Sequence, residues 1–521
     1  MSLRLPLRER EIPLPGAAGG GLRTGTLLLA GLFAVYVVGG LFVLAHHEPW
    51  RDEAQAWLIA RDLPFRPMLF EQMGHEGTPA LWHLLNGLLI ALGLPYESQG
   101  YLNFAFAAGA VGLILWRAPF PPLVKALFAF SYYLAFEYSH IARNFALGAL
   151  LLTAVLALFG QRHRRPLLYA ALVALMANAN VFTFLMALAF GLIHAVEAWR
   201  DGRVRAALPG AAVMAAAGLL AFVQMIPAAD NFRTGGALGM ANMMAPGNAV
   251  QAGFELFYGH FDYKLRELAQ RWPAMRLLFL PLGALVVAFW ALFLLRIRSS
   301  WAALLFFAVV AGGILSIMVF KKEGSPRVHG HLLLAAMGAL WLQALLGRPP
   351  AALRLPWGGV VPAARLGLAF TVALTAGLGL SVLRTGWHWA KEVRTPFSGA
   401  REMAAHLRAN GLDRHPIVAY ESAWGSAVLP YLDRDALFYY PDLERHGSYL
   451  VWTRAWWERH QDLSLDAILR SAEAGIGTLD GVLFLMSRPF DDPRLEPLHA
   501  VAEGVERETF HLYRLRGGAP P

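Results

Sequence analysis

Long apolar runs alternate with short polar turns over the first three quarters of the chain. Residues 24–45 contain no charged side chain, and about 20 apolar residues are enough for a helix to span the hydrocarbon core of a bilayer. Because backbone groups in lipid must hydrogen-bond within their own segment, such runs predict helices. The pattern predicts spans near residues 24–45, 78–94, 100–116, 121–138, 142–160, 166–179, 180–199, 206–227, 275–296, 300–320, 327–346 and 361–383.

The charges between these runs predict how the helices cross the membrane. Four arginines precede the first run, and basic clusters follow at 162–165, 200–205 and 296–298. The positive-inside rule assigns all of them to the cytoplasm. If the C-terminal part is extracytoplasmic, counting the spans back from it places the three basic clusters in the cytoplasm, as the rule requires. The same count places residues 46–77 on the wrong side for a cytoplasmic N-terminus. One run between 78 and 140 must therefore be missed, split or re-entrant, and we expect about 11–13 spans.

Three polar stretches define the remaining organisation: 46–77, 228–274 and 384–521. The prediction is a cytoplasmic tail at 1–23, a membrane domain at 24–383 with the first two stretches as extracytoplasmic loops, and an extracytoplasmic soluble domain at 384–521. Helical patterns near 396–411 and 462–474 alternate in the last domain with short strand-like runs, which is typical of an α/β fold. These runs lie at 416–420, 436–440, 447–452, 481–486 and 509–516. The predicted fold class is an all-α polytopic membrane protein with a small C-terminal α/β soluble domain.

Composition supports this prediction and excludes several kinds of chemistry. Only 16% of the residues are charged, against about 25% in ordinary soluble domains. The net charge of +9 comes from the basic clusters that fix topology and meet anionic lipid headgroups, so we expect no nucleic-acid partner. The chain has no cysteine, which excludes disulfides, thiolate metal sites and cysteine nucleophiles. His194, Glu197 and Asn178 lie near the ends of spans and are expected to make hydrogen bonds between packed helices.

The loop after the first span carries the candidate chemistry. Pro49 and the spacing of the apolar residues after it predict a helix on the membrane surface, with Asp52 and Glu53 at its start. A carboxylate there could take the proton from an acceptor hydroxyl during sugar transfer. From the residues alone, we favour the simpler interpretation that Asp52 and Glu53 cap the helix and interact with its positive end. His75 and Glu76 form a second polar cluster at the mouth of the next run.

Four short motifs resemble those of a known group of enzymes. They are WRDEAQAWLIAR at 50–61, EGTP at 76–79, EYSHIARNF at 137–145 and KKEGSPR at 321–327. They look like motifs of the GT-C fold glycosyltransferases. Within these, the chain is most similar to the superfamily of protein O-mannosyltransferases and aminoarabinose transferases (glycosyltransferase family 39-like). The likeness in layout covers most of residues 24–345, although the family's aromatic and proline residues after the last motif are replaced by Val-His-Gly-His.

The resemblance implies a role for each matching residue. Asp52 would be the general base, and Glu53 would support it or the acceptor. Glu76 matches a position that binds a divalent metal in some relatives, so a metal held by Glu76 and His75 is one alternative and a site without metal is the other. Residues implied to bind the donor are Glu76, Arg143, Lys321, Lys322 and Arg327, the basic ones because they could stabilise a leaving phosphate.

The resemblance also implies a function and a place for it. The expected reaction moves a sugar from a polyprenyl-phosphate donor to a hydroxyl or amine on a lipid, glycan or protein acceptor, with inversion at the anomeric carbon. The expected location is a bacterial inner membrane, with membrane lipids around the spans and the active site on the periplasmic side. A transporter or flippase for a lipid-linked saccharide is the main alternative, and such a protein should carry charges or broken helices within its spans.

Overall fold

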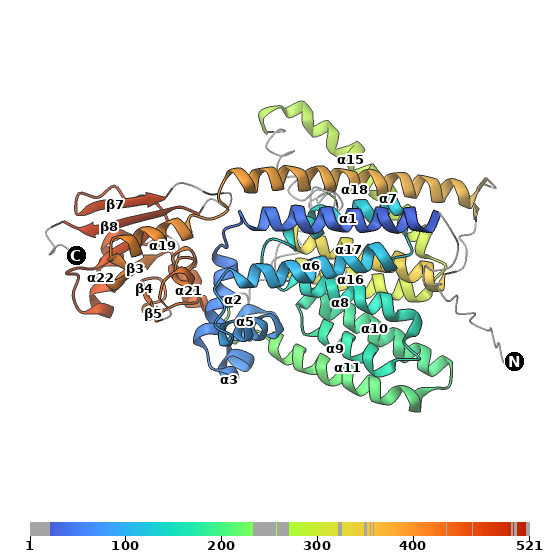
Figure 1. The fold of residues 1–521 in the computed structure, drawn as a ribbon, viewed down its shortest axis with the longest axis horizontal. Coiled ribbons are helices and arrows are strands. Elements are labelled where there is room, and N and C mark those ends of the chain that lie inside the picture. The colour runs from blue at the N-terminus through green and yellow to red at the C-terminus, as the bar shows by residue number, and fades with distance from the viewer. Residues whose placement is uncertain are drawn as a thin grey trace.

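The computed structural model describes residues 21–232, 257, 270–320, 326–347, 352–354, 356–357, 359–433, 435–460, 462–501, 504 and 508–516. This part of the chain is an elongated helical bundle with a smaller sheet-containing domain at one end of its long axis (Figure 1). The structure thus confirms the predicted fold class. The bundle is built from α1 (Gly21–Leu44), α6 (Ser98–Arg117), α7 (Pro122–Ala129), the π-helical turn η2 (Tyr133–Glu137), α8 (Phe145–Leu158), η3 (Phe159–Gln161), α9 (Pro166–Ala177), α10 (Val181–Arg200), α11 (Val204–Met225), η4 (Pro273–Leu278), α15 (Phe279–Ile297), α16 (Trp301–Phe320), α17 (Pro326–Leu346) and α18 (Ala363–Arg394).

The apolar helices of the bundle make this an integral membrane protein. Seven of the described helices are long and apolar enough to cross a bilayer. They are Gly25–Leu44, Ser98–Arg117, Val181–Arg200, Val204–Met225, Trp301–Met318, Arg327–Leu346 and Ala363–Arg394. Four apolar helices are shorter: Leu81–Ala91, Phe145–Gln161, Pro166–Ala177 and Pro281–Ile297. The last of the long helices continues past residue 383, where the sequence pattern ended it, to Arg394.

One of the shorter helices explains the disagreement in the count of spans. The predicted span at 78–94 is only the 11-residue helix α5 (Leu81–Ala91), which is too short to cross a bilayer core. It lies beside α2 (Arg51–Asp62), since Leu89 shares an apolar cluster with Trp57, and Trp82 shares another with Ala56. Both helices lie at the end of the bundle that carries the C-terminal domain (Figure 1). If 78–94 is not counted as a span, the count along the sequence assigns the start of the first span and the three basic clusters to the same side of the membrane.

The path of α11 supports that arrangement. Just beyond its C-terminal end, the amide of Ala228 donates to the carbonyl of Gly74 in α4 (Met73–Glu76). A 22-residue helix is about 33 Å long, so the basic turn at 200–205 lies far from α4, near the opposite end of the bundle. The connection from α2 to α4 is completed by α3 (Phe65–Pro67) and the π-helical turn η1 (Met68–Gln72). At the end away from the C-terminal domain, β1 (Leu353–Arg354) pairs with β2 (Val360–Val361) just before α18.

The C-terminal domain is a mixed six-stranded sheet with the strand order β5-β4-β3-β6-β8-β7. Its strands are β3 (Ile417–Tyr420), β4 (Phe438–Tyr440), β5 (Arg445–Gly447), β6 (Leu483–Met486), β7 (Leu495–Val501) and β8 (Phe510–Leu515). The central strand β3 is parallel to β4 and β6, and the outer pairs are antiparallel. Four of the five predicted strand-like runs contain one of these strands; 447–452 holds only the end of β5, and β7 was missed.

Helices cover both faces of this sheet. α19 (Ala400–Ala409) packs on the face that carries Ile417 and Ala419, and α22 (Leu465–Ile476) packs on the face that carries Val418 and Tyr420. This alternation follows from the two-residue period of a strand. Short helical turns connect the strands: η5 (Leu412–Arg414), α20 (Ser422–Gly425), η6 (Leu429–Tyr431) and α21 (Arg454–Arg459).

The apolar cluster between α19 and the sheet also includes side chains of α2, and so attaches the C-terminal domain to the end of the bundle. Ala54, Trp57 and Leu58 of α2 are buried with Met403 and Leu407 of α19. Burying such side chains stabilises their contact by about 1.5–3 kcal/mol each. The C-terminal domain is therefore held against α2, the helix that begins with Asp52 and Glu53.

Candidate active site at the end of the helical bundle

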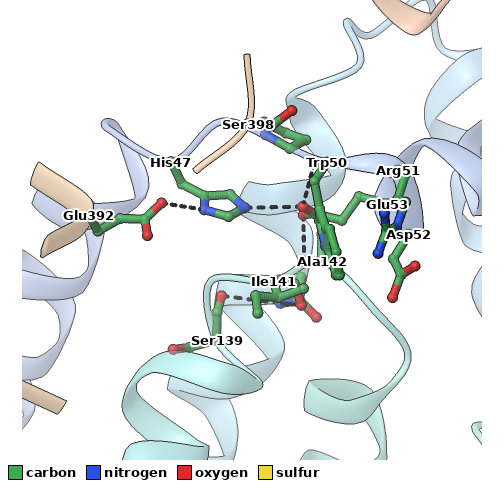
Figure 2. Close-up of polar contacts among 12 residues, drawn as sticks. His47, Trp50, Arg51, Asp52, Glu53, Ser139, Ile141, Ala142, Glu392 and Ser398 are labelled. Atoms are coloured by element: carbon green, nitrogen blue, oxygen red, sulfur yellow. Dashed lines mark hydrogen bonds and ion pairs between the residues drawn. The ribbon is translucent and has the colours of Figure 1, made fainter. Parts of the chain in front are cut away.

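The first turn of α2 directs two neighbouring carboxylates to different surroundings. Glu53 reaches back to accept a hydrogen bond of 3.1 Å from the amide of Trp50, which caps the helix. Adjacent helical residues point about 100° apart, so Asp52 faces another direction. In Figure 2 the Asp52 carboxylate lies away from the contacts that surround Glu53.

Glu53 is a buried connector between three parts of the bundle. Its Oε1 accepts a hydrogen bond of 2.7 Å from the amide of Ala142, and its Oε2 lies 3.1 Å from Nε2 of His47. Nδ1 of His47 lies 2.7 Å from Oε1 of Glu392, near the end of α18 (Figure 2). These side chains are almost completely inaccessible to solvent. Glu53 therefore joins α2 to α18 and to the loop before Arg143.

The charge on His47 is set by this network. Burial lowers the pKa of His47, but the carboxylates of Glu53 and Glu392 outweigh burial and raise it to about 10. His47 is therefore a cation at neutral pH, and each of its ring nitrogens faces a carboxylate. This is the arrangement that a buried charge requires to be stable.

Asp52 meets two arginines from distant parts of the chain. Its Oδ2 accepts hydrogen bonds of 2.5 Å from Nη1 of Arg143 and from Nη1 of Arg327. The three side chains keep 25%, 35% and 20% of their surface exposed, in the order Asp52, Arg143, Arg327. Burial opposes ionisation of Asp52, but these arginines and Arg51 hold the pKa of its carboxyl well below the ordinary value. Asp52 is thus ionised and, in this arrangement, a weak base.

Arg327 is held from two further sides. Its Nε donates a hydrogen bond of 2.7 Å to Oε1 of Glu137, and its guanidinium carbon lies 4.9 Å from the centre of the Trp50 ring. Oε2 of Glu137 accepts a hydrogen bond of 2.6 Å from the hydroxyl of Tyr132. A side chain at Gly330 would collide with the rings of Tyr133 and Tyr138, so glycine lets the first turn of α17 lie against η2 and brings Arg327 to Glu137.

The C-terminal domain contributes to the other side of α2. The guanidinium carbon of Arg51 lies 5.0 Å from the ring of Trp50 and 4.5 Å from the ring of Trp424. The amide of Arg51 donates to Oε1 of Glu508, whose Oε2 accepts a hydrogen bond of 2.6 Å from Ser398. Burial raises the pKa of Glu508 to about 7, against the opposing effects of Ser398 and Arg51.

The remaining predicted site residues have other hydrogen-bond or ion-pair partners, or lie outside the described residues. Glu76 accepts hydrogen bonds from Gln55 and Gln72, and His75 lies 3.6 Å from Asp230. Within the described parts of the chain no three His, Cys, Asp or Glu residues are grouped so as to hold a metal ion. Lys321 and Lys322 fall outside the described residues.

Sequence reasoning missed several residues of this cluster. Glu137 lies inside the predicted span at 121–138, and an ionisable residue in a span is by default a functional candidate. That signal, together with its place in the EYSHIARNF motif, could have identified it. Glu508 and Trp424 had no such signal, because they lie far away in the chain and reach α2 only through the packing of the C-terminal domain.

Among known proteins, the chain matches solved structures only. No protein-family model and no curated protein matches the chain. Two crystal structures of ArnT from Cupriavidus metallidurans are similar to it over 96% of this chain and 100% of theirs, each with a TM-score of 0.43. One is bound to undecaprenyl phosphate and is 15% identical; the other is in the apo state and is 14% identical.

Proposed function

We propose that this protein transfers a sugar from a polyprenyl-phosphate donor to a hydroxyl or amine of an acceptor, with Asp52 as the general base. The observation that carries the proposal is the cluster of Asp52, Arg143 and Arg327, in which a carboxylate and two guanidinium groups meet at a partly exposed site. Three of the four sequence motifs each contribute one residue to this cluster: Asp52 comes from 50–61, Arg143 from 137–145 and Arg327 from 321–327. The bundle's apolar surface suits the lipid part of such a donor.

The chemistry assigns separate roles to the two kinds of charge. The acceptor oxygen or nitrogen attacks the anomeric carbon and loses its proton to Asp52, while the bond from that carbon to the phosphate oxygen breaks. The lipid phosphate leaves with the electron pair. Arg143 and Arg327 would stabilise its charge, because guanidinium groups match phosphate oxygens in a forked geometry.

The proposed location is the extracytoplasmic face. The basic turns between bundle helices favour the cytoplasm, and the one at 200–205 lies far from α4 along α11. Asp52, α5 and the C-terminal domain are at the end that carries α4 (Figure 1), which this orientation puts outside the cytoplasm.

The test is transfer of a labelled sugar from a polyprenyl-phosphate donor by the purified protein in lipid nanodiscs. Acceptors would come from membranes of cells lacking the gene, with products identified by mass spectrometry. The Asp52→Asn variant should lose transfer by about 100- to 10,000-fold, the usual contribution of a general base. Its unfolding free energy should stay within about 1 kcal/mol of the wild type, because the cluster is partly exposed. Transfer at the wild-type rate by this variant would remove Asp52 as the base.

A flippase for a lipid-linked saccharide is the second candidate. It is favoured by the π-helical turn η2, which carries the buried Glu137 at the point where the α7 segment stops being a regular α-helix, since broken helices with ionisable residues are found in transporters. Fluorescent lipid-linked sugar in proteoliposomes distinguishes the two functions. Movement across the bilayer without any glycosylated product would favour the flippase.

A further inference from the structure

Asp52 is hydrogen-bonded to Arg143 and Arg327, the two arginines to which the proposed function assigns the donor phosphate. Both hydrogen bonds end on the single oxygen Oδ2, so each guanidinium offers only one N–H group to Asp52. Because Asp52, Arg143 and Arg327 are all partly exposed, an anion from outside can reach the two guanidinium groups and compete with this single oxygen. We propose that the phosphate of the lipid donor displaces Asp52 from Arg143 and Arg327, and that this exchange frees Asp52 to act as the base.

The two arginines are fixed by contacts that do not involve Asp52. Arg327 keeps its hydrogen bond to Glu137 and its contact with the ring of Trp50. The backbone beside Arg143 is held by the hydrogen bond from the amide of Ala142 to Glu53. The guanidinium carbon of Arg143 lies 5.4 Å from the centre of the Phe145 ring. The two guanidinium groups would therefore stay close together after Asp52 turned away, which is what a preorganised anion site requires.

The charges around the site favour an added anion. Arg51, Arg143 and Arg327 all act on Asp52. Of the other carboxylates, Glu137 accepts a hydrogen bond from Arg327, and Glu508 accepts one from the amide of Arg51. When Asp52 leaves the arginines, the site loses one negative charge beside these three cations until the phosphate enters. A phosphate diester carries one negative charge and so replaces the one that Asp52 withdraws.

The exchange also gives an order to the reaction. While Asp52 is held by the two arginines, its proton affinity is too low for efficient proton abstraction. After the donor phosphate takes its place, Asp52 can accept the proton of the acceptor as the new glycosidic bond forms and the bond to phosphate breaks. Loss of that proton to solvent restores the carboxylate, which can return to the arginines and displace the lipid phosphate product. This sequence rests on the proposed function, whereas the competition between carboxylate and phosphate does not.

The test measures binding of a lipid phosphate that carries no sugar. Farnesyl phosphate is titrated by calorimetry into the full-length chain in nanodiscs, as wild type and as Asp52→Asn. The asparagine variant should bind it about tenfold or more tightly, because a charge-assisted competitor has been removed. Arg143→Ala in the Asp52→Asn background should abolish the gain. Farnesol, which lacks the phosphate, should bind all variants equally.

A matched control is Glu71→Gln, which removes one negative charge from an exposed residue of η1 in the same loop. It should bind farnesyl phosphate as the wild type does. A gain as large as that of Asp52→Asn would overturn the proposal, because it would show a general effect of charge. Unchanged or weaker binding by Asp52→Asn, or no binding by any variant, would also overturn it.

Structure determination of the wild type with farnesyl phosphate provides a measurement that needs no variant. The phosphate should lie between Arg143 and Arg327, with Asp52 turned away from both. A bound phosphate with Asp52 still on both guanidinium groups would overturn the exchange. The two proposals fail separately: tighter binding by Asp52→Asn without any sugar transfer by the wild type supports exchange and overturns the transferase function. Transfer by the wild type with unchanged Asp52→Asn binding does the reverse.

Discussion

Two groups of arginine and carboxylate in this bundle show how differently the same charges can be used. Arg162, at the turn after η3, pairs with Glu197 of α10 through two hydrogen bonds of 2.9 and 2.8 Å, one to each carboxylate oxygen. Arg162 also donates to the carbonyl of Phe159 and lies over its ring. Both side chains are at least 91% buried. At the other group, Asp52 uses one oxygen for two arginines, and all three side chains keep at least a fifth of their surface exposed.

The difference separates a structural ion pair from an exchangeable one. In the Arg162–Glu197 pair each charge is satisfied by a forked partner, so no position remains for a ligand. The expected hydrogen bonds between packed helices are thus confirmed for Glu197, and for Asn178, which donates to the carbonyl of Ala217 in α11. The expectation was wrong for His194, whose buried ring nitrogens have no hydrogen-bond partner among the described residues. In the Asp52 group the carboxylate and both guanidinium groups are partly exposed, so an added anion can compete. Burial and geometry, rather than the presence of arginine and carboxylate, distinguish the two groups.

The largest expected effect comes from breaking the structural pair. Arg162→Ala leaves Glu197 buried without its partner, which should cost about 3–5 kcal/mol of unfolding free energy. Denaturant unfolding in detergent micelles measures it, with Asp52→Asn as the comparison. A loss below about 1 kcal/mol would contradict the assignment of this pair to stability.

A smaller effect is expected from the neighbour of Asp52. Glu53→Gln keeps an oxygen for the amide of Ala142 but removes the charge that faces His47, so we expect a loss of about 1–3 kcal/mol of unfolding free energy. Sugar transfer should fall less than in Asp52→Asn, because Glu53 positions the loop before Arg143 and does not face the exposed site. Unfolding and transfer rates are measured on the same preparation. A fully stable Glu53→Gln protein with transfer as low as that of Asp52→Asn would instead make Glu53 the base.

A further effect, which depends on pH, concerns Glu508 on the side of α2 that faces the C-terminal domain. Because burial raises the pKa of Glu508 to about 7, the folded state holds this proton to a higher pH than the unfolded state does. The stabilisation is complete below the ordinary value of 4.5 and is lost as the pH rises through about 7. Melting temperatures between pH 4.5 and 8 should therefore fall more steeply for the wild type than for Glu508→Gln. Parallel curves for the two proteins would show that Glu508 does not titrate in this range.

Much of the architecture follows from local sequence pattern. The uncharged run at 24–45 becomes α1, and the alternating runs of the C-terminal part become β3, β4, β6 and β8. Run length and periodicity predict these elements because lipid and the two faces of a sheet each select side chains locally. The predicted span at 78–94 was wrong, because an apolar run can also be buried against α2 at the end of the bundle.

For the candidate site too, some features follow from the local sequence and others only from the tertiary structure. The sequence by itself determined that Asp52 and Glu53 begin a helix after the first span, and the resemblance drew attention to Arg143 and Arg327. Only the tertiary structure decided that Asp52 meets both arginines while Glu53 is buried on His47. Adjacent residues are alike to any local pattern, and their environments are set by segments nearly 100 to more than 300 residues away. Contacts over such separations depend on how whole helices pack, which no local period encodes.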